Sequence, residues 1–420
     1  MTLFVLLSTL VSLAALFGLV SHRVLRLPVS IGTTILSLCA AAALLAVGQV
    51  APGLHATAEH IVAGIDFNQV VLHGMLAFLL FAAALQLNLE ELSRQKLAVF
   101  SLSLLATALS TLFVAGLFKL GLLAIGVPLS TMGALLFGAL ISPTDPIAVL
   151  EMLRRIGAPA ALEAQLAGES LFNDGVGAVI FLALVDASIG GSLPSPAHFA
   201  ALLLSKAIGG IAIGALLGYL TYRLLLLVDD YRIEVLLTLA LAMGGYALAD
   251  ALHVSAPLEV VTAGLLVSGR GRSLAMSEEV RSHVETFWGL IDDIFNVVLF
   301  LLLGLELLVL PLQVRFVVAG LLAIPIVLLA RCASVSLTVE ALAFVGNRIP
   351  GSIQVLTWGG LRGGLAVALA LSLPGRQGLE RSLLLVTTYV VVVFSIVVQG
   401  LTITHLLRRL GLQSTSTDPA

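Results

Sequence analysis

Long apolar runs recur along the whole chain, and they constrain its fold more than any other feature. A helix needs about 20 mostly apolar residues to cross the hydrocarbon core of a bilayer. Thirteen runs of suitable length are separated by short polar or Gly/Pro-containing stretches: 3–20, 27–47, 69–88, 96–118, 126–154, 159–187, 198–227, 231–251, 256–269, 280–309, 313–344, 350–374 and 382–409. Transmembrane barrels instead show segments of alternating polarity. The sequence therefore predicts an all-α membrane protein with about 13 transmembrane helices.

Composition supports this interpretation. Hydrophobic residues make up 59% of the 420 residues and charged residues only 11%, whereas a soluble domain is about one quarter charged. Cys39 and Cys332 lie within apolar spans, where small buried side chains are expected rather than a disulfide or a metal site. The lipid bilayer is the expected surrounding, and neither a cofactor nor a nucleic acid partner is expected.

The basic residues predict the orientation of the chain, because Lys and Arg near span ends stay on the cytoplasmic side. One arrangement places most of them inside and leaves outside only Lys119, Arg315, Arg376 and Arg381. It puts the N-terminus outside and the C-terminus in the cytoplasm, which requires an odd number of spans. The first span lacks the positively charged region that lies before the apolar segment of a cleaved signal peptide, so we expect it to be retained as a helix. The expected location is a bacterial inner membrane.

Two spans carry residues that interrupt a helix. The fifth contains Pro143 and Pro146, which disfavour helical geometry at and before them. The twelfth contains Trp358-Gly-Gly-Leu-Arg362-Gly-Gly364, in which four glycines let the backbone unwind. Because these spans are seven apart, spans one to six and eight to thirteen are predicted to form an inverted repeat with two crossed discontinuous helices.

Five ionisable side chains fall near the middle of spans, where each costs about 2.5–3.5 kcal/mol on insertion scales. They are Asp145, Glu169, Asp174, Arg331 and Arg362. If Glu169 and Asp145 pair with the two arginines in either order, Asp174 has no basic partner. Intramembrane acids are functional by default, so Asp174 is the first candidate binding carboxylate, and Asp145 is a second candidate for binding the ion or the proton.

Oxygen-bearing side chains surround Asp174 in the sequence. Helical spacing puts Glu169 above Asn173 and Ser170 above Asp174. A hard monovalent cation prefers such oxygens, together with unwound carbonyls around Thr144. Burial favours a protonated carboxyl, whereas a bound cation favours the ionised form. Protons and cations would therefore compete for Asp174, and competition at one site is exchange.

Interhelical packing is the alternative role for these side chains, because membrane bundles also use polar groups to join helices. For Glu169 with Arg331 we favour this structural role, since a buried pair can fix helix packing. Arg362 either stabilises the broken helices or touches the ion path, and we favour the first. Glu259, Glu306 and the Asp292-Asp293 pair are expected toward span ends, near water, without a role.

These motifs match a known family. The chain resembles the monovalent cation:proton antiporter family, in its sodium/proton exchanger branch with an Asn-Asp motif. The resemblance rests on Ser142-Pro-Thr144-Asp145-Pro146, Gly168-Glu169-Ser170-Leu-Phe-Asn173-Asp174-Gly175, Ala330-Arg331 and Trp358-Gly-Gly-Leu-Arg362-Gly-Gly364. It covers nearly the whole chain.

The resemblance implies a thirteen-helix homodimer that works by elevator-like alternating access. It implies scaffold and dimerisation helices in 1–95, core transport helices in 96–190, a connector and scaffold helices in 191–309, core helices in 310–410, and a short cytoplasmic tail in 411–420. The core would move against the scaffold and carry the bound ion across.

The resemblance also assigns roles to residues. Asp174 would bind Na⁺, or Li⁺, and the proton, while Thr144, Ser170 and Asn173 contribute to or organise the site. Asp145 and Arg362 would be the charges at the helix crossing, and Glu169 and Arg331 a structural ion pair. One exchanging carboxylate implies electroneutral one-for-one exchange. The third span has only alanines at 82–84, where some relatives carry an acid, so no further ligand is expected there.

Four rival functions are weighed at this stage. One is a membrane scaffold without transport, against which the clustered Gly/Pro breaks argue. A K⁺/H⁺ antiporter of the same fold would use the same residues. A cation channel lined by Asp145 and Asp174 would conduct without any requirement for protons. A carrier of organic anions would need helix N-termini or bases at its site, whereas here the buried acids outnumber the bases.

Overall fold

Each of the thirteen predicted ranges contains helix where the structure describes it. The computed structural model describes residues 3–48, 53, 60–62, 64–65, 67, 69–189, 195–271, 276–343, 349–373 and 378–412. Within them, nine helices are long and apolar enough to cross a membrane, and one bent pair adds a tenth. The helical membrane fold is therefore confirmed, while thirteen crossings remain a prediction.

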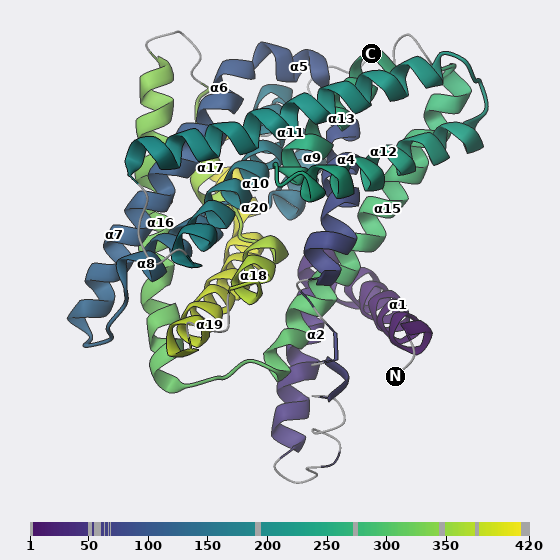
Figure 1. Ribbon diagram of the computed structural model, residues 1–420. Helices are drawn as coiled ribbons and strands as arrows, with labels where there is room; N and C mark the ends of the chain where they lie inside the picture. Colours follow the sequence, from purple (N-terminus) through teal and green to yellow (C-terminus); the bar gives the residue numbers. More distant parts are fainter. Residues whose placement is uncertain are drawn as a thin grey trace.

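One group of helices packs around α13 and α15. In this group α2 lies along α15, α4 lies against both α13 and α15, and α11 and α12 cover α13 (Figure 1). The elements are α1 (Leu3–Val20), η1 (Ser21–Leu25), α2 (Val29–Val47), η2 (Gln69–Met75), α4 (Leu76–Gln86), α11 (Pro196–Leu225), α12 (Tyr231–Ala251), α13 (Ala256–Leu266), η4 (Val267–Gly271), α15 (Glu278–Leu305) and η5 (Glu306–Leu308).

A second group packs around α16 and α10. Here α7 lies against α8 and α16, α19 against α16 and α18, and α10 against α8. The elements are α5 (Leu89–Arg94), α6 (Lys96–Ser101), η3 (Leu102–Ala106), α7 (Thr107–Ala124), α8 (Thr131–Ile141), α9 (Ile147–Ile156), α10 (Ala160–Ile189), α16 (Val314–Ala343), α17 (Ser352–Gly359), α18 (Gly364–Leu371), α19 (Gly378–Phe394), η7 (Ser395–Gln399) and α20 (Gly400–Arg409).

Two helices of the second group are broken where the sequence predicts. The α8–α9 pair is interrupted at 142–146, and the α17–α18 pair is interrupted at 360–363 and bent by 47°. The breaks touch, because the Asp145 backbone N–H donates to the Leu361 carbonyl at 2.8 Å. A Cβ at Gly363 would overlap the Asp145 carboxylate, so only glycine permits this approach. The two crossed discontinuous helices are thus confirmed.

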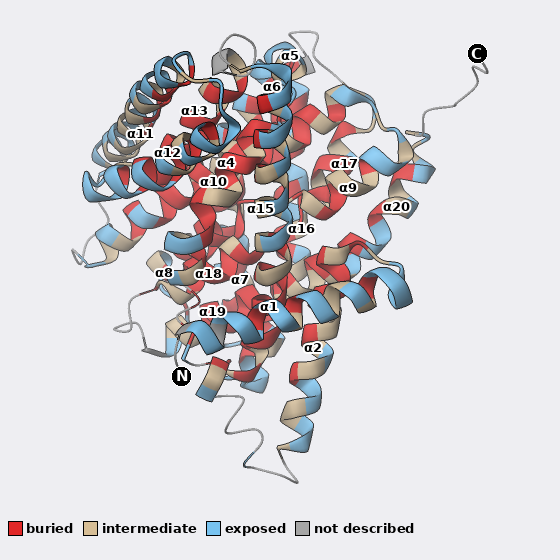
Figure 2. Cartoon of the chain, turned by 90° about the vertical axis from the view of Figure 1, so that its right-hand side faces the viewer, coloured by how far each residue is buried: buried red, intermediate tan, exposed pale blue. Residues whose placement is uncertain are grey.

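Exposed apolar side chains cover the outside of the bundle. Figure 2 shows buried residues gathered along its inside and exposed ones along the outer faces of α1 and α11. Cys39 and Cys332 belong to the exposed set. The expectation that they are buried is wrong, because an apolar span does not reveal which of its faces meets lipid.

Two of the acids expected near water are instead buried. Glu259 has no exposed surface and Glu306 is 7% exposed. Glu259 lies in the first turn of α13, against the backbone of α12 at Gly245. Among the described residues, neither of its carboxylate oxygens has a hydrogen-bond partner. Most of the tail expected at 411–420, from 413 onward, lies outside the described residues.

Candidate functional site

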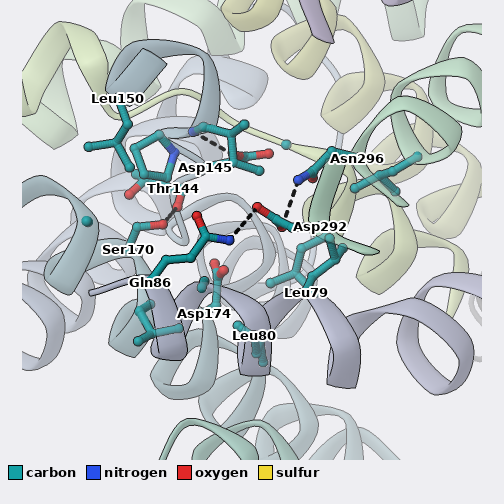
Figure 3. A pocket seen from close by; sticks show the side chains of 18 of the residues that line it. Leu79, Leu80, Gln86, Thr144, Asp145, Leu150, Ser170, Asp174, Asp292 and Asn296 are labelled. Atoms are coloured by element: carbon teal, nitrogen blue, oxygen red, sulfur yellow. Dashed lines mark hydrogen bonds between the residues drawn. The ribbon is translucent and has the colours of Figure 1, made fainter. Parts of the chain in front are cut away.

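A cavity of about 620 Å³ separates the two groups of helices. Side chains of α4 and α15 line one wall. The opposite wall comes from α10, from the break between α8 and α9, from one face along the length of α9, and from Gly363, Leu365 and Ala366. Figure 3 shows three carboxylates around this space: Asp174, Asp145 and Asp292.

Asp174 lies on α10 and lines the cavity. Among the described residues, no side chain or backbone group donates a hydrogen bond to its carboxylate, and no base pairs with it. Gly177, one turn further along α10, packs against the Pro143 ring at a distance that a larger residue would not allow. The sequence thus places Asp174 beside the helix break with its oxygens available to a ligand.

Thr144 and Ser170 join the break to α10 next to Asp174. The Ser170 hydroxyl donates a short hydrogen bond to the Thr144 carbonyl. Asn173 holds Thr144 twice, since its Oδ1 accepts from the Thr144 backbone N–H at 3.2 Å and its Nδ2 donates to Thr144 Oγ1 at 2.9 Å. Thr144 and Ser170 line the cavity, whereas Asn173 has no exposed surface and does not.

Glu169 and Arg331 form a buried ion pair behind this network. Arg331 Nη1 lies 2.6 Å from Glu169 Oε1, and Nη2 donates to Oε2 at 2.8 Å. Both side chains are at most 1% exposed. Glu169 Oε1 also accepts from Asn173 Nδ2 at 3.3 Å, and Arg331 Nε donates to the Leu356 carbonyl in α17 at 3.2 Å. The pair therefore links α10, α16 and α17.

Asp145 and Arg362 lie at the crossing but do not pair with each other. Asp145 Oδ1 accepts from the backbone N–H of Ile147, the first residue of α9, at 3.1 Å. Arg362 Nη1 donates to the carbonyls of Pro143 at 3.2 Å and Gly360 at 3.3 Å. The guanidinium thus satisfies carbonyls freed where α8 and α17 end. The expected pairing of Asp145 with an arginine is absent among the described contacts.

Three cavity-lining residues were missed by the sequence analysis. Asp292 and Asn296 come from α15 and Gln86 from α4, which is the span from which no ligand was expected. Gln86 Nε2 donates to Asp292 Oδ2 at 3.4 Å, and Asn296 Nδ2 donates to Asp292 Oδ1 at 2.9 Å. The only signal in the sequence was Asp292 itself, an acid near the middle of the span predicted at 280–309. We expected this residue toward the end of that span.

The acidic side chains that line the cavity outnumber the basic ones. Of its basic lining residues, Arg155 pairs with Glu151 at 2.6 Å and Arg154 lies 3.7 Å from Glu163. No base of the described chain pairs with Asp145, Asp174 or Asp292. Carboxylates along a cleft with low-dielectric walls raise the local concentration of cations. The arrangement therefore suits a cation that exchanges with a proton.

Comparison with known proteins agrees with this chemistry. Residues 11–409 match the family model described as sodium/hydrogen exchanger, transmembrane. The chain is 42% identical to the Na⁺/H⁺ antiporter NhaP of Pseudomonas aeruginosa over 96% of both chains. It is 35% identical to the Na⁺/H⁺ antiporter NhaH of Halobacillus dabanensis, over 82% of this chain and 84% of that protein.

The fold also matches a solved structure. The sodium proton antiporter MjNhaP1 from Methanocaldococcus jannaschii superposes with a TM-score of 0.75 at 19% identity, covering 98% of this chain and 99% of that one. The family match, the relatives and this fold agree with one another. The chain belongs to the transmembrane sodium/hydrogen exchanger family.

Proposed function

We propose that this protein exchanges Na⁺ for H⁺ across a membrane, with Asp174 as the carboxylate that binds each in turn. The observation that carries the proposal is the Asp174 carboxylate, which faces a cavity and has no partner among the described residues. A carboxylate left in this state needs a counterion or a proton, because an isolated charge is costly at that depth. The names of the relatives support Na⁺ as the ion.

The cation would be held by oxygen atoms that the structure brings together. Asp174 supplies a charge, Ser170 a hydroxyl whose own proton is already donated to Thr144, and Thr144 a hydroxyl that accepts from Asn173. Asn173 keeps Thr144 in place from behind. Li⁺ has the same ligand preference, and a K⁺/H⁺ antiporter would use the same atoms at longer distances.

The exchange would be electroneutral, with one Na⁺ for one H⁺. Each ion neutralises the same Asp174 carboxylate, so the site crosses the membrane with no net charge in either direction. Glu169 is bound to Arg331, so it does not add a second exchanging carboxylate. We assign Asp145 to the helix crossing, where its Oδ1 accepts from the Ile147 backbone N–H. An imposed membrane potential should then leave the direction of Na⁺ flux unchanged.

Transport would follow an elevator mechanism, with the core helices in 96–190 and 310–410 moving against the scaffold in 1–95 and 191–309. The cavity between α4–α15 and α10–α18 lies along this boundary. Buried contacts such as the Glu169–Arg331 pair join core helices to one another. A rigid core would carry Asp174 from one side of the membrane to the other.

A homodimer in a bacterial inner membrane is the proposed assembly, with the N-terminus outside and the C-terminus in the cytoplasm. This orientation puts Arg154 and Arg155 on the cytoplasmic side, and both line the cavity. The cavity would then open to the cytoplasm. Pairwise cysteine cross-linking in membranes and accessibility of single cysteines to an impermeant reagent test the dimer and the orientation.

Exchange in proteoliposomes tests the proposed function. Vesicles containing a pH dye, with voltage clamped at zero and a proton gradient imposed, would receive Na⁺, Li⁺ or K⁺. Wild type should dissipate the gradient on addition of Na⁺, whereas Asp174→Asn should behave like empty vesicles. Asp186→Asn is the matched control, because Asp186 lies on the same helix and pairs with Lys206 at 2.9 Å, outside the cavity.

Each alternative gives a different result in this assay. A larger response to K⁺ than to Na⁺ would favour a K⁺/H⁺ antiporter. Cation current without any proton movement would indicate a channel. No response of wild type to any of the three cations would refute the proposal.

A further inference from the structure

The wall of the cavity opposite Asp174 carries a carboxylate that the exchange mechanism does not use. Asp292 lies on α15, and its two oxygens each accept one amide hydrogen bond, from Gln86 and from Asn296. Each carboxylate oxygen offers two acceptor positions, so both retain one. Figure 3 shows the carboxylates of Asp292 and Asp174 around the same cavity, which both residues line.

Asn296 provides a second, independent feature at this position. The residue is 5% exposed, lines the cavity, and uses Nδ2 to hold Asp292. Its Oδ1 is buried and has no hydrogen-bond partner among the described residues. A buried amide oxygen without a partner costs about 1–3 kcal/mol. This oxygen therefore lacks a donor or a cation among the described residues.

Asp292 and Asp174 lie on helices of the two different groups that face each other across the cavity. Within the described residues, no three His, Cys, Asp or Glu side chains converge as they would around one metal ion. Asp174 belongs to α10 in the proposed core, whereas Asp292 and Asn296 belong to α15 in the proposed scaffold. An ion bound at Asp292 would stay behind when the core moves.

We propose that Asp292 and Asn296 form an entry site for a partly hydrated monovalent cation, which passes the ion to Asp174. The ligands are a remaining position on the Asp292 carboxylate and the unpartnered Asn296 Oδ1, and Gln86 holds the carboxylate in place from α4. Water completes the shell on the cavity side. This inference rests on the proposed function and adds to it the path by which the cation reaches Asp174.

The Na⁺ dependence of exchange tests the entry site. Asp292→Asn should raise the half-saturating Na⁺ concentration by about tenfold, equivalent to about 1.4 kcal/mol. Its maximal rate should match that of wild type, because Asp174 is intact. Asn296→Ala should shift the half-saturating concentration in the same direction. Asp293→Asn is the matched control, since this neighbouring carboxylate lines the cavity but holds neither Gln86 nor Asn296.

Two results of this assay would overturn the proposal. One is an unchanged half-saturating concentration in Asp292→Asn. The other is an equal shift in Asp293→Asn, which would indicate a general effect of cavity charge. Repeating the titration in about 1 M choline chloride, where the Debye length is about 3 Å, separates direct binding from long-range attraction. If Na⁺ binds Asp292 directly, the shift in the half-saturating Na⁺ concentration should persist in choline chloride. Disappearance of that shift would also overturn the entry site.

A measurement without transport separates the entry site from the proposed function. Crystals of Asp174→Ala soaked in Tl⁺, a heavy monovalent cation, should show an anomalous peak between Asp292 and Asn296. The same soak of Asp174→Ala combined with Asp292→Asn should show none. Absence of the peak in the first crystal overturns the entry site. If wild type failed to exchange any cation, the proposed function would fail while the Tl⁺ result would still decide this inference.

Discussion

Asn173 connects a buried ion pair to the atoms proposed to bind the cation. Its Nδ2 contacts both Glu169 Oε1 and Thr144 Oγ1, and its Oδ1 accepts from the Thr144 backbone N–H. The Glu169–Arg331 pair therefore fixes the Asn173 rotamer, and Asn173 in turn fixes Thr144. At the scale of single residues, hydrogen bonds and an ion pair thus hold in place the residues behind the site as well as those that line it.

Removing the Glu169 charge should destabilise the protein. In Glu169→Gln the guanidinium of Arg331 stays buried without its carboxylate, which costs about 3–5 kcal/mol in comparable buried pairs. Thermal unfolding in detergent should show a clearly lower midpoint than wild type. The double variant Glu169→Leu with Arg331→Met removes both charges and should recover much of that loss. An unchanged midpoint in Glu169→Gln would contradict the structural role.

Glu259 should tolerate loss of its charge. It has no exposed surface and neither oxygen has a partner among the described residues, so an ionised carboxylate there gains nothing from its surroundings. Glu259→Gln keeps the shape and should unfold at the same temperature as wild type or higher, in the same detergent assay. A large loss of stability or of exchange would show that the carboxyl group has a partner or a role in transport.

Close contact between helix backbones positions the broken helices. A Cβ at Gly138 in α8 would overlap the Thr111 carbonyl oxygen in α7, which is backbone and cannot turn aside. Thr111 Oγ1 also donates to Ser142 Oγ at 3.2 Å, where α8 ends. The position of the break relative to α7 thus depends on the absence of a Cβ atom at residue 138.

Gly138→Ala should therefore be destabilising, by about 1–3 kcal/mol as in other overpacked cores. Gly116→Ala is the control, because Gly116 lies on α7 and a Cβ added there would meet nothing within 4 Å in the described part of the chain. The free energy of unfolding of that variant should lie within about 0.5 kcal/mol of the wild-type value. Equal midpoints for the two variants in thermal unfolding would contradict this account of the α7–α8 contact.

Position along a span was predictable from the sequence, whereas the direction of each side chain was not. Pro143, Pro146 and the glycines at 359–364 located both breaks, because their backbone chemistry acts locally. In the sequence, Glu259 and Asp292 of the Asp292-Asp293 pair looked alike, as acids expected toward span ends. Only packing shows that one faces a cavity and the other faces Gly245. Side-chain direction depends on helices far away in the chain.

The same limit explains how the acids and bases pair. Counting charges correctly left Asp174 without a partner, but it also assigned an arginine to Asp145. Arg362 instead donates to the Pro143 and Gly360 carbonyls, because interrupted helices free backbone acceptors that compete with carboxylates. A tally of side-chain charges omits those acceptors.

At the scale of the whole molecule, the proposed elevator mechanism would require contacts between α15 and α18 to change during transport. Leu299 on α15 packs directly against Gly364 at the start of α18. In a background with Cys39 and Cys332 replaced by Ser, Leu299→Cys with Gly364→Cys should form a disulfide on oxidation. Exchange should then stop and return on reduction. Each single cysteine variant is the control, and full exchange by the oxidised pair would contradict relative movement at this contact.

The hydrogen bond between Asp145 N–H and the Leu361 carbonyl also bears on the order of biosynthesis. Leu361 is synthesised more than two hundred residues after Asp145, so the first break enters the bilayer before its partner exists. Until then, the backbone donor of Asp145 has no acceptor from the second break. The first broken helix should therefore reach its final depth in the membrane only after the ribosome has completed the second.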